Sequence, residues 1–161
     1  MVFTGTFEHA IDAKQRVAIP SKVRAQVQRT LGLADGDPMV WVVTLGDDGC
    51  LALYTADGFN DLAEALRSSD LDPDELLAYE RLLFTTAEEV ETDRTGRVRL
   101  PERLLAQAGL SGDVVILGNN DHLEIRDRTA WNAERSRLLT ERPDLLMNPR
   151  RALRMAGKRS D

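Results

Sequence analysis

The chain has 161 residues, of which 42% are hydrophobic and 30% are charged, as in a soluble globular protein of one or two small domains. Its formal net charge is −6, no apolar run approaches the ~18 residues that a membrane span needs, and the start lacks the basic and apolar regions of a secretory signal. One cysteine and two histidines exclude an internal disulfide and an ordinary structural zinc site, so we expect a cytoplasmic protein with no metal, cofactor or membrane partner.

The negative charge is concentrated in the middle of the chain. Between Asp47 and Glu91, acidic side chains outnumber basic ones by thirteen to two. In the first thirty residues, by contrast, five basic side chains stand against two acidic ones. An acidic total therefore does not exclude a local basic surface that contacts nucleic acid.

The first half of the chain predicts short strands, a helix, a hairpin and a second helix. Val23 and Val27 have helical spacing, and Pro20 precedes them, where a missing N–H costs no helical hydrogen bond. Thr55 is the expected N-cap of the second helix. In chain order, the predicted elements are a turn at 12–16, a strand at 17–19, a helix at 21–31, hairpin strands at 39–43 and 51–53, and a helix at 56–67.

The second half repeats this series, so that residues 7–67 are echoed by residues 88–139. Residues 12–20, Asp-Ala-Lys-Gln-Arg-Val-Ala-Ile-Pro, match residues 93–101, Asp-Arg-Thr-Gly-Arg-Val-Arg-Leu-Pro. The repeat length is too great for a solenoid and indicates a duplicated domain. The further elements predicted are a connecting helix that opens at 72–75, a strand at 98–100, a helix at 101–108, hairpin strands at 114–117 and 123–125, and a helix at 130–139 with Thr129 as its N-cap.

These patterns give four segments: a first repeat over residues 1–68, a connecting helix within 69–86, a second repeat over 87–140, and a C-terminal extension over 141–161. One repeat of four short strands is too small to bury a sufficient core. Pairing two repeats covers the exposed sheet edges and doubles the apolar interior. We therefore expect an α+β fold in which the repeats form a pseudo-twofold, interleaved β-barrel with peripheral helices.

In tandem, the two motifs closely resemble the paired Asp-x-x-x-Arg motifs of the MraZ family. The resemblance covers roughly residues 1 to 140, and extends to Phe3-Thr4-Gly5 near the start and Leu82-Leu83 before the second motif. It implies two SpoVT/AbrB-type repeats that form a swapped-hairpin, double-psi-type barrel. It also implies a transcriptional regulator on the nucleoid: a ring-shaped homo-oligomer that binds direct repeats in double-stranded promoter DNA and mainly represses the division and cell-wall operon containing its own gene.

The family's DNA contacts fall on Arg16 and Arg97 in this sequence. A turn between two strands projects its long side chains outward, so we expect two basic tips, one with Lys14 beside Arg16 and one with Arg94 beside Arg97. Each tip offers few contacts, so affinity must come from several subunits acting together. Additional phosphate contacts are expected from Lys22, Arg24 and Arg99.

An aspartate stands four residues before each arginine, Asp12 in the first motif and Asp93 in the second. We expect it to orient the guanidinium or to hold the turn, although aspartate also forms turns without any functional role. The family usually has glycine before the arginine, as at Gly96, whereas the first copy has Gln15. If this position needs a positive φ, Gln15 is strained by about 1 kcal/mol and the two halves are unequal DNA readers.

Structural roles are the simpler interpretation for the other notable residues. We expect His9 and His122 to be structural, Cys50 to be a semi-buried residue, and Trp41 and Trp131 to anchor the core or a subunit interface. The tail either adds phosphate attraction or is a frayed, solubilising end. Its basic residues are Arg150, Arg151, Arg154, Lys158 and Arg159.

An enzyme is not expected, because the sequence has no Gly-rich phosphate loop, no metal-ligand spacing and no Ser-His or Cys-His constellation. We also expect no small-molecule substrate. The alternative is an antitoxin-like repressor or a scaffold protein, whose AbrB-like fold mainly binds a protein partner. The leucines of the acidic middle helices could form its binding face: Leu66, Leu71, Leu76 and Leu77.

Overall fold

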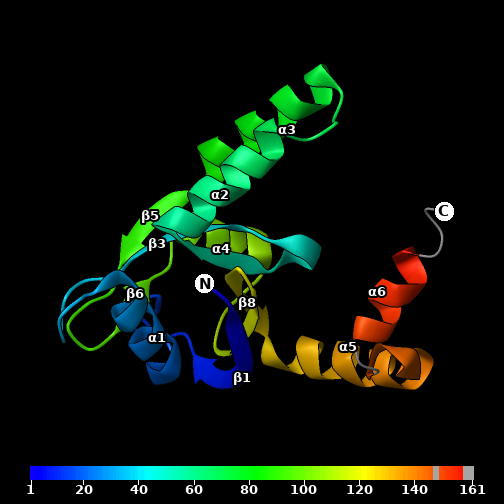
Figure 1. Ribbon diagram of the computed structural model, residues 1–161. Helices are drawn as coiled ribbons and strands as arrows, with labels where there is room; N and C mark the ends of the chain where they lie inside the picture. The colour runs from blue at the N-terminus through cyan, green and yellow to red at the C-terminus, as the bar shows by residue number, and fades with distance from the viewer. Residues whose placement is uncertain (147–148, 158–161) are drawn as a thin grey trace. The chain divides into compact units, whose positions relative to one another are not determined.

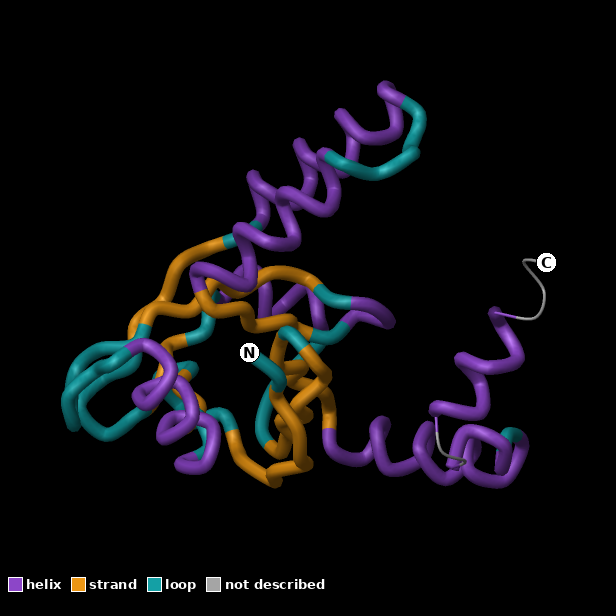
Figure 2. Tube along the Cα trace, in the orientation of Figure 1, coloured by secondary structure: helices purple, strands orange, loops and turns teal. Residues whose placement is uncertain are grey.

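The computed structural model describes residues 1–146 and 149–157 (Figures 1 and 2). The chain forms two compact units, Met1–Arg128 and Thr129–Asp161. None of the described helices is both long and apolar enough to cross a membrane. The phosphate attraction considered for Lys158 and Arg159 concerns positions outside the described residues.

The structure is α+β. The strands are β1 (Phe3–Ala10), β2 (Arg16–Ala18), β3 (Val40–Leu45), β4 (Leu51–Thr55), β5 (Glu88–Glu91), β6 (Arg97–Arg99), β7 (Asp113–Asn120) and β8 (His122–Asp127). The α-helices are α1 (Ser21–Leu31), α2 (Ala56–Arg67), α3 (Pro73–Thr86), α4 (Glu102–Ala108), α5 (Arg128–Glu141) and α6 (Pro149–Gly157). Two 3-10 turns are η1 (Asp47–Gly49) and η2 (Pro143–Leu146).

Local sequence determines where most helices begin and end. Helices α1 and α2 have the predicted bounds, and the Thr55 side chain caps α2 by accepting a hydrogen bond from the Gly58 N–H at 3.1 Å. The predicted cap at Thr129 is wrong, because α5 already begins at Arg128. Asp127, which ends β8, therefore precedes the helix, and aspartate is itself favoured at that position.

Strands of both repeats are interleaved in one antiparallel sheet with the order β1-β7-β8-β4-β3-β5. When β1 to β4 are matched with β5 to β8, this order is the same from either end. The first repeat's β1 pairs with β7 from Phe3↔Asn120 to Ala10↔Asp113, and the second repeat's β5 pairs with β3 in the equivalent way. Strands β4 and β8 pair with each other at the centre. The sheet is therefore pseudo-twofold, and neither repeat completes it alone.

Strands β2 and β6 form a separate two-stranded antiparallel sheet. Val17 and Val98 are direct partners in it, and both are buried. The same register places Arg16 opposite Arg99 and Ala18 opposite Arg97. Each of these strands begins at the arginine of one Asp-x-x-x-Arg motif, so this small sheet joins the two motifs to each other.

The core is largely aliphatic and is built from both repeats. Its aromatic members include Trp41, which is 0% exposed, and Phe3, whose ring centroid lies 5.9 Å from that of Trp41. Trp41 is therefore the core anchor that the sequence predicts. Cys50 is more deeply buried than expected, and burial raises the pKa of its thiol to about 11, so it is protonated at neutral pH.

Helices α2 and α3 lie side by side (Figure 1), and the rings of Phe59 and Phe84 meet edge to face at 5.8 Å. Neither helix contains a buried residue. Helix α3 exposes four large apolar side chains, those of Leu77, Tyr79, Leu82 and Phe84. This pair of helices thus presents apolar surface together with six of the thirteen acidic residues of the middle segment.

The β1–β7 pairing predicts that Gly118 cannot carry a side chain. A Cβ atom on Gly118 would lie 2.4 Å from the backbone N of Thr4 and 2.7 Å from its Cα. We expect Gly118→Ala to lower the free energy of unfolding by about 1–3 kcal/mol, because backbone must move to admit the methyl group. Urea unfolding would measure this loss. Gly157→Ala is the control, since its Cβ would meet no atom within 4 Å, and an equal loss in both variants would contradict the prediction.

Candidate nucleic-acid interface

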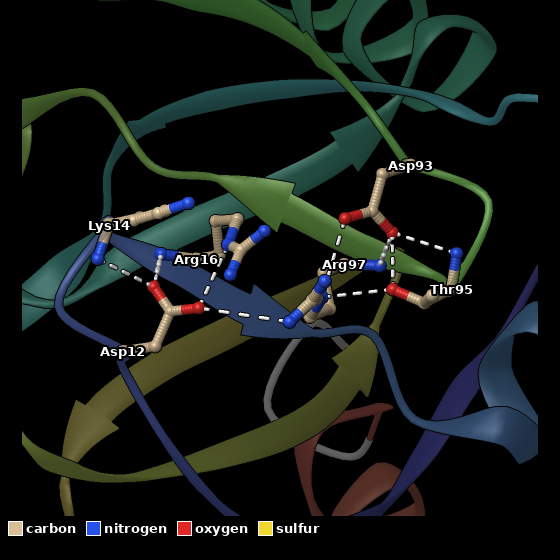
Figure 3. A network of polar contacts seen from close by, with 6 residues as sticks. All are labelled: Asp12, Lys14, Arg16, Asp93, Thr95 and Arg97. Carbon is tan, nitrogen blue, oxygen red and sulfur yellow. Dashed lines mark hydrogen bonds and ion pairs between the residues drawn. The ribbon is translucent and has the colours of Figure 1, made fainter.

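Asp12 holds the first turn, residues 12–16, with both of its side-chain oxygens. Oδ1 accepts hydrogen bonds from the backbone N–H groups of Lys14 and Arg16, each at 2.9 Å. Oδ2 accepts one from Nε of Arg16 at 2.8 Å. The Asp12 N–H also donates to the carbonyl of Arg16 at 2.9 Å. One carboxylate therefore fixes the backbone of the turn and the direction of the arginine side chain (Figure 3).

Asp93 holds the second turn, residues 93–97, in a similar way. Its Oδ1 accepts from the N–H groups of Thr95 at 2.9 Å and Arg97 at 3.0 Å, and its Oδ2 accepts from Nε of Arg97 at 3.3 Å. The Thr95 hydroxyl adds two contacts, since it donates to Asp93 Oδ1 at 2.7 Å and accepts from Nε of Arg97 at 2.9 Å. These hydroxyl contacts have no counterpart in the first turn, where Lys14 takes the place of Thr95.

Backbone hydrogen bonds join the two turns across the repeats. The Ile19 N–H donates to the carbonyl of Gly96 at 2.9 Å, and the Leu100 N–H donates to the carbonyl of Gln15 at 2.8 Å. Gly96 and Gln15 are the residues directly before the two arginines. The turns are therefore parts of one pseudo-symmetric unit rather than two separate tips, and in Figure 3 they lie next to each other.

Both residues that precede the arginines have left-handed backbone, with φ of 62° at Gln15 and 80° at Gly96. The positive φ considered from the sequence is thus confirmed. Left-handed backbone is strained for a residue with a Cβ atom, so Gln15 is the strained residue of the two. Gly96 has a second constraint, because a Cβ atom there would lie 2.5 Å from Nε and Cζ of Arg24. Arg24 covers the second turn and donates from Nε to the Ile19 carbonyl at 3.1 Å.

The candidate cations differ in how freely they could reach a ligand. The side chains of Arg16 and Arg97 are 28% and 35% exposed, and Nε of each is engaged by its own aspartate. Arg24 is half-buried. The other cations predicted to contact DNA are exposed: Lys14, Lys22, Arg94 and Arg99. Since Nε is engaged inward, the terminal guanidinium nitrogens are the part of each arginine that can meet a phosphate or a base edge.

Hydrogen bonding stabilises the charged form of both aspartates. The backbone N–H of Arg16, followed by its side chain, lowers the pKa of Asp12. The Thr95 hydroxyl and then the Arg97 N–H lower the pKa of Asp93 well below its usual range. At neutral pH each turn therefore contains a carboxylate that balances part of the arginine charge and keeps its side chain ordered.

Sequence reasoning missed two features of this site. Thr95 was only a variable letter within the motif, although a hydroxyl residue two positions after a turn aspartate is a recognisable signal for local hydrogen bonding. The second feature is an ion pair between the repeats, with Nη1 of Arg97 lying 3.9 Å from Oδ2 of Asp12. No pattern within one motif could have indicated that contact, because it depends on the pairing of β2 with β6.

A second polar cluster lies on β7 and β8. Glu124 is buried and accepts hydrogen bonds from Nδ2 of Asn119 at 2.8 Å and Nε of Arg126 at 2.6 Å. Burial raises the pKa of Glu124, but the hydrogen bonds from Arg126 and Asn119 outweigh it, and the pKa is lowered overall. His122 stacks on Tyr54 at 5.0 Å and contacts Asp121, which is the structural role expected for it. Across residues 1–146 and 149–157, no group of three or more potential ligands could hold a metal ion.

Comparison with known proteins shows a family to which the chain is similar. The family model of the MraZ protein, whose description compares it with antitoxins, matches residues 2–78 and 83–143. A transcriptional regulator MraZ of Thermomicrobium roseum is 37% identical over 144 residues, which are 89% of this chain and 94% of that protein. A relative of the same name from Acetivibrio thermocellus is 36% identical over 82% of this chain and 85% of that protein. Another, from Mycoplasmoides gallisepticum, is 35% identical over 81% of this chain and 84% of that protein.

The left-handed positions predict opposite effects for reciprocal substitutions. Gln15→Gly removes a strained side chain, so we expect the free energy of unfolding to rise by about 1 kcal/mol. Gly96→Gln introduces the same strain and also displaces Arg24, so we expect a loss of more than about 1 kcal/mol. Urea unfolding of both variants would test this. A loss of stability in Gln15→Gly would contradict the strain that we assign to that position.

The lowered carboxyl pKa values predict an acid-sensitive contribution from the two turns. Both groups have folded-state pKa values below the usual 3.8, so their stabilising effect is full above that value and is lost as the pH falls through the lowered values. Between about pH 6 and about pH 3, we expect the urea midpoint to fall further in the wild type than in Asp12→Asn/Asp93→Asn. Equal falls in the two proteins would show that these carboxylates contribute nothing to acid sensitivity.

Proposed function

Since the chain belongs to the MraZ family, we propose that it is a transcriptional regulator that binds duplex DNA through its two turns. The observation that supports this most directly is the pairing of two aspartate-held arginines, Arg16 and Arg97, at the ends of adjacent strands. An arginine whose Nε is already engaged can present its terminal nitrogens to a guanine edge or a phosphate with less loss of entropy.

The exposed cations around this pair would supply further phosphate contacts. Lys14 and Arg94 belong to the turns, and Lys22 and Arg99 lie on the adjoining α1 and β6. Such contacts release counterions and add sequence-independent affinity that weakens with salt. Neither α1 nor β6 contains an acidic residue, so local attraction is compatible with an overall charge of −6.

One subunit offers only a few phosphate contacts, so we propose that several subunits act together as a ring-shaped homo-oligomer on repeated promoter sites. The exposed apolar side chains of α3 are a surface that such assembly could bury. The family resemblance further leads us to propose repression of the division and cell-wall operon containing its own gene. We also propose a finer description of the fold, a swapped-hairpin barrel of double-psi type. The pairing of strands between the repeats supports it.

A protein-binding role is the second candidate, and the same α3 surface is the observation that favours it. Helix α3 lies in the strongly acidic middle segment of the chain, and its exposed apolar side chains are those of Leu77, Tyr79, Leu82 and Phe84. An antitoxin-like protein would use such a face for a basic partner and keep the turns for DNA. The two candidates separate on whether the purified chain alone recognises a DNA sequence.

DNA binding predicts a specific weakening on removal of either arginine. We expect Arg16→Ala and Arg97→Ala each to weaken binding to the DNA upstream of the protein's own gene, because each removes a charged contact to a phosphate or a base edge; loss of a bidentate base contact, worth about 1–3 kcal/mol, would weaken binding by about tenfold or more. Fluorescence anisotropy over a salt series would measure affinity and its salt slope, which should become less negative by about 0.9 for each phosphate that the variant no longer neutralises.

Arg81→Ala is the matched control, since it removes the same charge from α3 rather than from a turn. It should leave both the affinity and the salt slope unchanged. A wild-type protein that binds the upstream duplex no better than a scrambled duplex at low salt would reject the proposed function.

A further inference from the structure

The two turns differ at the second position after the aspartate. In the second turn, the Thr95 hydroxyl bridges the aspartate and the arginine, at 2.7 Å from Asp93 Oδ1 and 2.9 Å from Nε of Arg97. In the first turn, the same position is Lys14, whose backbone N–H contacts Asp12. Within the described residues, no side-chain contact of Lys14 takes the place of that bridge.

Arg97 is consequently held by more groups than Arg16. Its Nε is shared between Asp93 and Thr95, and its Nη1 lies 3.9 Å from the Asp12 carboxylate of the other repeat. For the Arg16 side chain, the polar contact among the described residues is with Asp12, through Nε. Asp12 therefore faces both arginines, whereas Asp93 contacts the arginine of its own turn.

We infer that Thr95 is a positioning residue for Arg97, which makes the second turn the principal reader of base sequence and leaves the first turn mainly to attract phosphates. This inference rests on the proposed function. The roles of the two turns follow from their side chains, because the second turn contains Thr95 with Arg97 and the first contains Lys14 with Arg16.

A contact to a base edge requires a correctly oriented guanidinium, and Thr95 helps to orient that of Arg97. A guanidinium can bond O6 and N7 of guanine together only when its plane lies correctly in the groove. Contacts to Nε from Asp93 and Thr95, with the approach of Nη1 to Asp12, restrict rotation about the end of the Arg97 side chain. The restriction exists before DNA arrives, so less side-chain entropy is lost on binding.

A phosphate contact has weaker demands on direction, and the first turn meets those. Lys14 is exposed and has a compact charge on a flexible stem, which suits attraction to phosphates rather than recognition of a planar base edge. Arg16 adds a second charge. The strained Gln15 beside it is tolerable in a turn whose arginine does not need an exact orientation.

Three variants test this division: Thr95→Val, which keeps the shape but removes the hydroxyl, Thr95→Ser, which retains the hydroxyl, and Lys14→Met, which keeps most of the stem but removes the charge. Each is titrated with the upstream duplex and a scrambled duplex over a salt series. The specificity ratio is the affinity for the upstream duplex divided by that for the scrambled duplex.

For Thr95→Val we expect the specificity ratio to fall about 2- to 10-fold, the usual effect of one hydrogen bond, with the salt slope unchanged. Thr95→Ser should restore the ratio. Lys14→Met should weaken binding to both duplexes, reduce the magnitude of the salt slope by about 0.9, and leave the ratio unchanged.

Nuclear magnetic resonance of the free protein gives a readout that does not depend on DNA. The Nε–H signal of Arg97 should be protected from exchange in the wild type and in Thr95→Ser, and should lose that protection in Thr95→Val. An Nε–H signal that is the same in all three proteins would overturn the positioning role. A specificity ratio that is unchanged in Thr95→Val, or one that falls in Lys14→Met, would overturn the division between the turns. A wild-type protein without any preference would instead overturn the proposed function itself.

Discussion

The carboxylate of a turn aspartate is the group on which the rest of the site depends. In each repeat it accepts two backbone N–H groups and the Nε of an arginine four residues later. A tight turn leaves these donors without partners from a regular sheet ladder, and a short acidic side chain supplies acceptors at the right distance. The arginine is thereby oriented by the same group that shapes its turn. Loss of the carboxylate would affect the fold of the turn and the direction of the guanidinium together.

Pairing between the repeats connects the two aspartate-held turns to the rest of the fold. Strands β2 and β6 join the two turns, and the six-stranded sheet places every outer strand beside a strand of the other repeat. A single repeat would expose strand edges and too little apolar interior to be stable. The charge distribution follows the same organisation, because α2 and α3 contain three acidic residues each, whereas the charged residues of α1, β2 and β6 are all basic.

Much of this architecture could be predicted from the sequence because its signals are local. The bounds of α1 and α2, the cap at Thr55 and the positive φ at Gln15 all arise from short-range constraints. The error at Thr129 is also local, since Asp127 competes for the position before α5. Strand order could not be predicted, because it depends on contacts between residues far apart in the chain. The same reason conceals the approach of Arg97 to Asp12, which the β2–β6 register creates.

The covalent joining of the repeats explains why their turns can differ. In a symmetric homodimer, both turns would have the same sequence, and any change that improved one contact would alter both. Within one chain, the second turn has a hydroxyl bridge and a glycine beneath Arg24, whereas the first has a lysine and a strained glutamine. A duplex presents bases and phosphates at different positions along its axis, so two unlike turns can each meet the group that suits them. On this reasoning, the asymmetry is a consequence of duplication that the pseudo-twofold sheet can accommodate, because the backbone pairing that holds the turns together involves carbonyl and N–H groups rather than side chains.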